Sequence, residues 1–493
     1  MKKDLFKSIT KKTVLIILIV LTIIQLTILV SWIINPWIKI EIFDNLTQTE
    51  TWFLRFTTTI TPTLFMVGIY TWLVKPLTKI FRKKPKFFQK MVEKIKKFET
   101  LDLPVKKSTV IIFFAVCLGL VLTLYPYNPT INPEVKPIGV DAKRYIDFLH
   151  KLIIQPSISQ AINQAFTTVD QGQRPFHLLI LYFIALFTEA NILDLVKFQL
   201  PFLILFILFT VYFFTFEGLK NRFYASTITL FTASSYLVTV GVFAAFYSNL
   251  FALSFCYLFL TFLLKYSVKP SKKFFWLMLG TSIPIIFIHP WTWSMLMGIT
   301  FIYLLLKFSR KNFSEKFKKE IFPVALILAI NVFTDLAIKS LIFQTLTGGA
   351  IAYTTVTSNI EFANLKNFPS NLFMTIRIFS GGIYSNFLIL FLSTLGIFSV
   401  GLHKDNFHQL LLAWILITSL IFPISNIVLQ SRLIFNLPLQ IFTVEGLFLL
   451  GALAQSGKNS KIRLEVKLLF LLLITASFSY AFRCVLNTVI GQL

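Results

Sequence analysis

Long, uninterrupted hydrophobic runs separated by short polar segments dominate the pattern of this chain. The first run, 13–34, has about the ~20-residue length that a helix needs to cross ~30 Å of hydrocarbon. No small-residue cleavage site follows it, so we expect a retained anchor rather than a signal peptide. The pattern predicts an all-α, polytopic transmembrane helix bundle of about 13–14 segments. The predicted segments are 13–34, 53–74, 109–126, 175–189, 195–216, 223–240, 248–264, 275–289, 292–306, 320–345, 383–401, 409–428, 433–453 and 466–487.

The spacing of these segments divides the chain into three parts. We expect an N-terminal two-helix membrane segment with a basic linker in 1–108, a larger transmembrane module in 109–455, and a C-terminal transmembrane helix in 456–493. The composition agrees, because 14% of the residues are charged, against about 25% in soluble domains.

The net charge of +26 is concentrated in the connections between hydrophobic runs. Loops rich in Lys and Arg stay in the cytoplasm, which places the N-terminus inside in a multi-pass protein of the cell membrane. The predicted inside loops are 1–12, 75–108, 265–274, 307–319, 403–408 and 455–465. Basic loops of this kind interact with the lipid bilayer, which explains the positive charge. No nucleic-acid partner is therefore expected.

The remaining connections are predicted outside, which creates one conflict of parity. Three hydrophobic segments lie between the outer loop 127–174 and the turn near Ser248, and both must be outside. An even number of crossings is therefore required, and the shortest segment, 175–189, is the one expected not to span. Partial segments at membrane depth are tolerated where protein buries them or where they line a cavity.

The outer loop 127–174 carries the most informative polar residues. We expect it to contain one or two surface helices, because apolar residues recur along one side of 146–153. Asp141 and Tyr145 are four residues apart, on the same side of such a helix. A carboxylate there suits general-base chemistry on a lipid-linked substrate. An aspartate at this place can also cap the helix.

Several segments together resemble the GT-C superfamily of membrane glycosyltransferases, which includes protein mannosyltransferases, aminoarabinose transferases and oligosaccharyltransferase catalytic subunits. An acidic residue and a tyrosine in the first outer loop precede Arg-Pro-Phe-His at 174–177, where the family has a His-Pro-Pro-Leu-like helix start. The segments 245–252, 288–293 and 430–438 add to the resemblance, which covers roughly 109–455. The chain departs from the family pattern in having neither a DxD nor a paired Asp-Glu in this loop.

The resemblance implies a GT-C-like core and a glycosyltransferase that uses a polyprenyl-phosphate-linked sugar donor at the outer leaflet, with an acceptor that the sequence does not identify. Asp141 is then the catalytic base or acceptor anchor, with Asp147 as its substitute. Tyr145 and Arg174 are expected to bind substrate or line its cavity. No cofactor is assigned, and a divalent metal ion stays open.

Two residues in predicted outer turns complete the expected site. Arg432 lies at the outer end of a hydrophobic run, and its planar fork of donors fits the phosphate of the donor lipid. Snorkelling to lipid headgroups is the alternative. His289 precedes Pro290 at another outer turn, and it is expected to line the cavity or simply to pack.

Other residues support a different class of function. Asp335 and Lys339 can pair within segment 320–345, and Glu445 lies inside segment 433–453. Ionisable groups at such depth often mark transport paths, so a secondary transporter or flippase is the alternative, followed by a non-catalytic scaffold. The three cysteines all lie in hydrophobic runs without zinc-type spacing, so no metal ligands are assigned.

Overall fold

The structure is a computed structural model, and it describes residues 102, 104–308, 315–360, 387–403, 405–454 and 464–492, with parts of 15–33. Within these residues it is all-α, as predicted, and the β-structure consists of one isolated bridge between Ile360 and Ser425. The predicted segment 53–74 lies outside the described residues.

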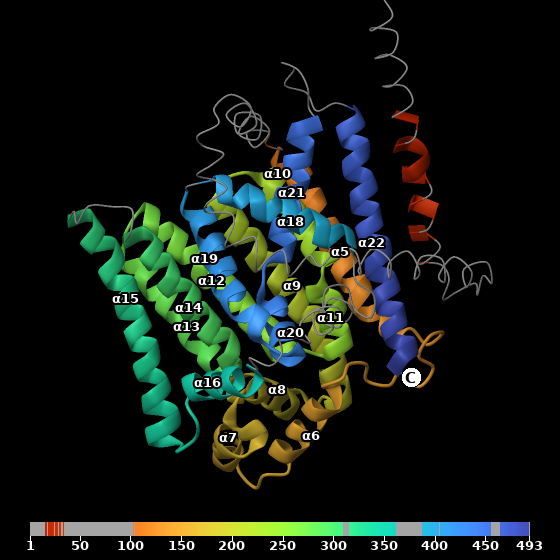
Figure 1. Ribbon diagram of the computed structural model, residues 1–493. Helices are drawn as coiled ribbons and strands as arrows, with labels where there is room; N and C mark the ends of the chain where they lie inside the picture. The colour runs from red at the N-terminus through yellow and green to blue at the C-terminus, as the bar shows by residue number, and fades with distance from the viewer. Residues whose placement is uncertain are drawn as a thin grey trace, which may run out of the picture.

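The helices follow the hydrophobic runs closely (Figure 1). They are α5 (Val105–Leu124), α6 (Ala142–Ile153), α7 (Ile158–Thr167), α8 (Pro175–Thr188), α9 (Ile192–Leu219), α10 (Arg222–Ala233), α11 (Tyr236–Ala244), α12 (Tyr247–Val268), α13 (Lys272–Ile288), α14 (Pro290–Phe308), α15 (Glu315–Asp335), α16 (Gly348–Asn359), α18 (Phe387–Leu402), α19 (Asn406–Ile421), α20 (Ile427–Asn436), α21 (Leu439–Ala454) and α22 (Leu464–Gln492), with a π-helix, η3 (Leu336–Ile342), that continues α15.

Six of the described stretches are long and apolar enough to cross a membrane, or seven if a bent pair counts as one span. They are Val105–Tyr127, Ile192–Leu219, Arg222–Ala244, Tyr247–Val268, Glu320–Ile342 and Val466–Leu486, with Ile427–Asn436 and Leu439–Ala452 as the bent pair. Their length and composition fit a multi-pass protein in a lipid bilayer.

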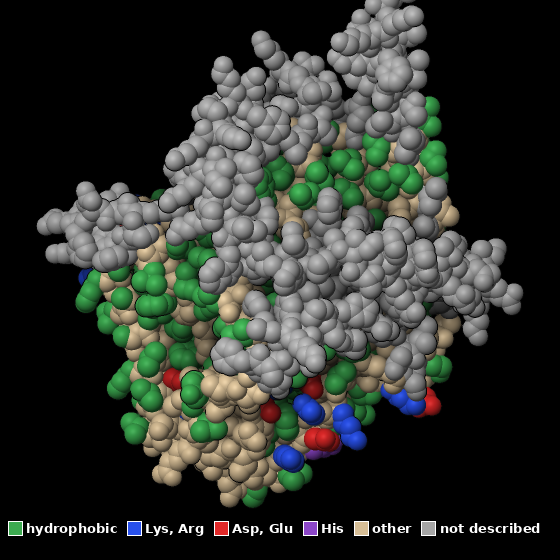
Figure 2. All heavy atoms as spheres, viewed as in Figure 1, with side chains coloured by type: hydrophobic (Ala, Val, Ile, Leu, Met, Phe, Trp, Pro, Cys, Tyr) green, Lys and Arg blue, Asp and Glu red, His purple; other side chains and the backbone are tan. Residues whose placement is uncertain are grey.

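The bundle has two chemically different ends. At one, which we call the basic end, ion pairs join neighbouring helix ends: Arg222 to Asp102, Lys265 to Glu217. The other, which we call the loop end, carries α6, α7, α8 and α16 (Figure 1). Figure 2 shows described charged side chains gathered at the loop end, below a flank covered by hydrophobic side chains.

The loop 127–174 forms surface helices, as expected. Helices α6 and α7 lie at the loop end, and α6 buries Tyr145, Leu149 and Leu152 completely. Ile153, predicted on the same apolar side, is 41% exposed. Helix α6 therefore packs on the bundle through the face that carries Tyr145, Leu149 and Leu152.

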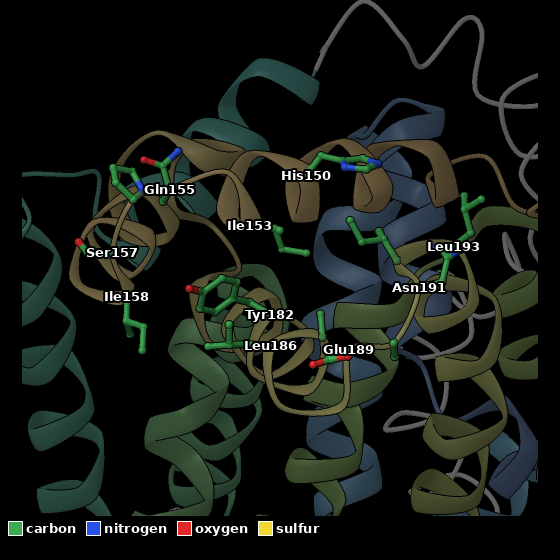
Figure 3. A pocket seen from close by; sticks show the side chains of 14 residues that line it. His150, Ile153, Gln155, Ser157, Ile158, Tyr182, Leu186, Glu189, Asn191 and Leu193 are labelled. Carbon is green, nitrogen blue, oxygen red and sulfur yellow. Dashed lines mark hydrogen bonds between the residues drawn. The ribbon is translucent and has the colours of Figure 1, made fainter.

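Helix α8, within the segment expected not to span, is short. Its 14 residues span about 21 Å, less than the ~30 Å hydrocarbon core. It packs against α6, α7 and α13 at the loop end. In Figure 3 the axis of α8 points toward the viewer, whereas the axes of the neighbouring helices are roughly vertical. Two of the candidate spans, Ile192–Leu219 and Arg222–Ala244, connect α8 to the α11–α12 turn.

The predicted segment 433–453 is divided between two helices, α20 and α21. The chain bends by 61° between them. Pro438 follows Leu437, whose φ of −81° and ψ of 132° are extended, as expected for a residue before proline. The bend leaves α20 at the loop end and aims α21 toward the basic end (Figure 1). Arg432 therefore lies on a short helix of its own.

Helices α18 and α21 cross in direct backbone contact. A Cβ on Gly446 would lie 1.9 Å from the Leu392 carbonyl oxygen, and one on Gly396 would lie 1.7 Å from the Phe442 oxygen. Small residues allow membrane helices to approach this closely.

We expect Gly446→Ala to destabilise the protein by roughly 1–3 kcal/mol, because the added methyl group must push two helices apart. Thermal unfolding in detergent measures the effect. Gly280→Ala is the matched control, since nothing lies within 4 Å of its Cβ position. Equal unfolding midpoints for the two variants would contradict the close crossing.

The arrangement also predicts which sites are accessible from each side. In a variant without the native cysteines, Ser159→Cys in α7 and Thr355→Cys in α16 should react with an impermeant maleimide added outside intact cells. Lys269→Cys, at the exposed end of α12, should react only after permeabilisation. Labelling of Ser159→Cys from the cytoplasmic side alone would reverse the orientation.

Candidate functional site

The segment leading into α6 is fastened to the bundle through its backbone. The amides of Val140 and Asp141 donate to the carbonyls of Phe243 and Ala244, at 3.0 and 3.2 Å. Gly139 has a φ of +123°, and a Cβ there would lie 2.6 Å from the Cβ of Ala245. Glycine is therefore required, and the Gly-Val-Asp sequence holds Asp141 beside the α11–α12 turn.

Asp141 occupies the N-cap position of α6, yet its side chain accepts no capping hydrogen bond. The side chain is 15% exposed and contacts the Nη1 atom of Arg144 at 3.2 Å. Arg144 is 68% exposed, so this pair is worth little. Helix capping therefore does not account for Asp141. Asp147 lies on the exposed face of α6, away from the residues packed around Tyr145.

Tyr145 is the centre of a buried hydrogen-bond network. Its hydroxyl accepts from Arg174 Nη1 and from the Ser248 amide, both at 3.1 Å. With both lone pairs used, the hydroxyl donates to Ser248 Oγ at 2.8 Å. The Tyr145 ring also packs 5.1 Å from that of Tyr247. Tyr145 thus couples α6 to the first turn of α12.

The network continues from Ser248 through a neutral histidine. Ser248 Oγ donates to His177 Nδ1 at 2.6 Å, and His177 Nε2 then donates to Gln199 Oε1 at 3.1 Å. This tautomer satisfies every member of the chain. Burial and then the charge of Arg174 lower the pKa of His177 to about 3. His177 therefore positions Ser248 and carries no charge at neutral pH.

Arg174 is the N-cap residue of α8, and its side chain lies between a carboxylate and an aromatic ring. Its Nε lies 2.6 Å from Asp170 Oδ2, and its guanidinium lies 5.6 Å from the centre of the Tyr145 ring. Asp170 and Gln171 have φ values of 51° and 54°, followed by Gly172 at 66°. Consecutive non-glycine residues in this region store about 1–3 kcal/mol each. The strained turn sets the position of the Asp170 carboxylate.

A second network surrounds His289 at the turn between α13 and α14. His289 Nδ1 and Thr292 Oγ1 lie 2.8 Å apart, and the Thr292 hydroxyl also lies 2.8 Å from Asn249 Oδ1 and 3.2 Å from Asn436 Oδ1. Burial, followed by the charges of Arg174 and Arg432, holds the pKa of His289 below its ordinary value. Burial and the charges of these two arginines therefore favour the neutral form of His289.

Arg432 is joined to this network through its backbone, because Asn436 Nδ2 donates to the Arg432 carbonyl at 2.8 Å. Its half-buried guanidinium has no hydrogen bond or ion pair with any residue that the structure describes. It lies close enough to Arg174 and Asp141 for their charges to act on it. The structure therefore brings Arg432, Arg174, Asp141 and His289 to the same part of the loop end.

The two networks meet at the first turn of α12. Ser248 belongs to the Tyr145 network and Asn249 to the Thr292 network. The sequence assigned no role to Ser248, Asn249, Asp170, His177 or Thr292. All of them except Asp170 lie inside the segments 174–177, 245–252 and 288–293, which carry the family resemblance and were the signal available.

A pocket of about 680 Å³ lies at the same end, between α6 and α7 on one side and α8 on the other (Figure 3). Its lining mixes apolar and polar side chains, among them Ile153, Leu186, His150 and Glu189. His150 lies nine residues along α6 from Asp141, or about 13 Å. The volume is within the range of small-molecule sites.

The residues of the transport alternative have separate surroundings. Asp335 accepts hydrogen bonds from the amides of Gly348 and Gly349, at 2.8 and 3.1 Å, and so caps α16. Lys339 is fully buried in η3, where the wider π-helical turn breaks the four-residue register, and it forms no ion pair with Asp335 among the described contacts. Its charge interacts with those of Asp335 and Asp170. Glu445 lies in α21, near His408.

The sequence was compared with models of known protein families and with curated proteins. No family model matches it, and no curated protein matches it.

Proposed function

We propose that the protein is a membrane glycosyltransferase of GT-C type, which transfers a sugar from a polyprenyl-phosphate-linked donor to an acceptor at the outer leaflet. In this proposal the protein resides in the cell membrane, its N-terminus lies in the cytoplasm, and the loop end faces outward. The donor and acceptor then meet beside Asp141.

The observation that carries the proposal is the unpaired guanidinium of Arg432 beside a second cation. The positive charge of Arg174 disfavours the charged form of Arg432 more than the Asp141 carboxylate favours it, which raises the free energy of the site. Arg174 has Asp170 as its partner, at 2.6 Å, whereas Arg432 has none among the described residues. A bound phosphate would supply the missing negative charge, and a guanidinium binds phosphate through paired hydrogen bonds.

The proposed reaction uses the two charges in separate roles. Asp141 accepts the proton of an acceptor hydroxyl, whose oxygen attacks the anomeric carbon of the donor sugar. The bond from that carbon to the phosphate oxygen breaks, and the phosphate leaves with both bonding electrons. Arg432 stabilises this leaving charge by direct contact, and Arg174 adds a second positive field.

Two further features support this assignment of roles. The largely buried Asp141 carboxylate makes no capping bond, and its one ion pair, through Oδ1, is to an exposed arginine, so the carboxylate can accept a hydrogen bond from a substrate. The pocket of Figure 3, which lies between α6 and α7 on one side and α8 on the other, offers room for an amphiphilic acceptor. His289 remains neutral, and its imidazole can either accept a hydrogen bond from the donor sugar or donate one to it.

The direct test is reconstitution of the purified protein in vesicles with synthetic polyprenyl-phosphate sugars of several types. Release of free polyprenyl phosphate measures transfer to an added acceptor and slower transfer to water. Activity with at least one donor is the expected result. A protein that binds none of the phosphate lipids and turns over none would refute the proposal.

A further inference from the structure

A second cluster of chemically active side chains lies at the basic end, far from Asp141. His403 and Asp405 lie in the turn between α18 and α19, and His408 lies in the first turn of α19. One potential ligand atom from each of the three lies within 4.8 Å of the others. Two of the five histidines in the chain are gathered there.

The short turn orients each of these side chains. Asp405 caps α19, since one of its oxygens accepts from the His408 amide at 3.0 Å. The other oxygen lies 2.6 Å from His408 Nδ1. The rings of His403 and His408 stack with their centres 4.1 Å apart. His408 is 3% exposed and Asp405 is 49% exposed, so the cluster has a buried side and an open one.

Glu445 provides an independent observation from another helix. Its side chain is completely buried in α21, and its Oε1 atom lies 3.4 Å from His408 Nε2. Among the described residues this oxygen accepts no hydrogen bond. The other oxygen accepts from the Tyr224 hydroxyl at 3.4 Å. A buried carboxylate is thus directed at the far nitrogen of His408.

We propose that His403, Asp405 and His408 bind a divalent first-row transition-metal ion, with Zn²⁺ as the suitable probe. Two imidazoles and one carboxylate are a ligand set that such ions accept, with a fourth position left for water. Once Nδ1 of His408 binds the metal, Nε2 carries the proton and donates it to Glu445. Metal-bound histidines are commonly held by a carboxylate in this way.

Charge and distance agree with this assignment. Two carboxylates with two neutral imidazoles carry a charge of −2, which a divalent ion balances. The ligand atoms lie within 4.8 Å of one another, wider than the roughly 3.3 Å between two ligands bonded at ~2.0–2.1 Å to a tetrahedral ion. Binding therefore draws the side chains inward by rotation. The competing state is a protonated His408 between Asp405 and Glu445, without a metal.

The experiment measures metal binding by the full-length protein in detergent, after EDTA treatment and dialysis. We expect one Zn²⁺ per chain, a higher unfolding midpoint with Zn²⁺, and visible absorption from the Co²⁺ form. His403→Ala and Asp405→Asn should each weaken Zn²⁺ binding at least tenfold. Glu445→Gln should weaken it by about 10- to 100-fold, as for other outer partners of metal-bound histidines.

His150→Ala is the matched control, because it removes an exposed histidine at the loop end, and its Zn²⁺ binding should equal that of the unmodified protein. His403→Ala and Asp405→Asn alter groups that are not fully buried, so they keep the test decisive if the His408 or Glu445 variants fail to fold. Absence of stoichiometric Zn²⁺ in the unmodified protein, or unchanged binding in His403→Ala, would overturn the proposal.

Discussion

Asp141→Asn is expected to lower the rate of sugar transfer by roughly 10²–10⁴-fold, the usual contribution of a general base. The amide has nearly the shape of the carboxylate but cannot accept the acceptor proton. Because Asp141 makes no capping bond and only one ion pair, with an exposed arginine, the fold should survive. Donor binding should also be kept, so the loss should appear in kcat.

Asp147→Asn is the matched control for this substitution. It makes the same chemical change on the same helix, at an exposed position, and should leave transfer within about twofold of the unmodified rate if Asp141 is the base. Loss of activity in Asp147→Asn alone would move the base to Asp147. Full sugar transfer in both variants would exclude both aspartates as the base. Absence of sugar transfer by the unmodified protein, together with a transport activity that Asp335→Asn or Glu445→Gln abolishes, would favour transport instead.

The helices could be predicted from the sequence because burial in lipid imposes a strong, local pattern. Runs such as 195–216 and 248–264 must be apolar throughout their length, and the structure forms α9 and α12 over them. The short length of α8 was likewise readable from the sequence, as one of the shortest of the hydrophobic runs, 175–189. The bend at Pro438 was missed, although the proline is a readable signal, because the apolar run continues through it.

The contacts within the candidate site could not be predicted in the same way. Tyr145 and Ser248 are 103 residues apart, so their hydrogen bond depends on how α6 docks on α12. Asp141 occupies an N-cap position, where sequence rules favour a capping role that its side chain does not adopt. The cluster of His403, Asp405 and His408 was not predicted, because these three residues do not follow a zinc-type Cys and His spacing.

The geometry of the loop end also explains why two networks are needed to build one site. The Tyr145 network fixes Arg174, while the Thr292 network fixes the backbone of Arg432 through Asn436. The adjacent residues Ser248 and Asn249 join the two networks at the start of α12. A shift of this turn would therefore change the separation of the two arginines, and with it the affinity for a phosphate.

Arg432→Ala is expected to weaken binding of the donor lipid by about 10- to 150-fold, with a smaller effect on kcat. A charge-assisted hydrogen bond to phosphate is worth roughly 1.5–3 kcal/mol, and 1.4 kcal/mol corresponds to about a tenfold change in affinity. Since the guanidinium has no hydrogen bond or ion pair with a described residue, its removal breaks none of these, and stability should change little. Binding of a polyprenyl-phosphate sugar to protein in nanodiscs measures the effect.

Arg432→Lys and Lys143→Ala distinguish a specific contact between Arg432 and the phosphate from nonspecific attraction of the lipid by the positive charges of the loop end. Lysine keeps the positive charge but loses the planar fork, so Arg432→Lys should recover only part of the affinity. Lys143 is exposed on α6, and removing its charge tests nonspecific attraction to an anionic lipid. If Lys143→Ala weakened binding as much as Arg432→Ala, the phosphate would be attracted by the surface as a whole. A loss confined to Arg432 would identify this guanidinium as the group that holds the donor phosphate.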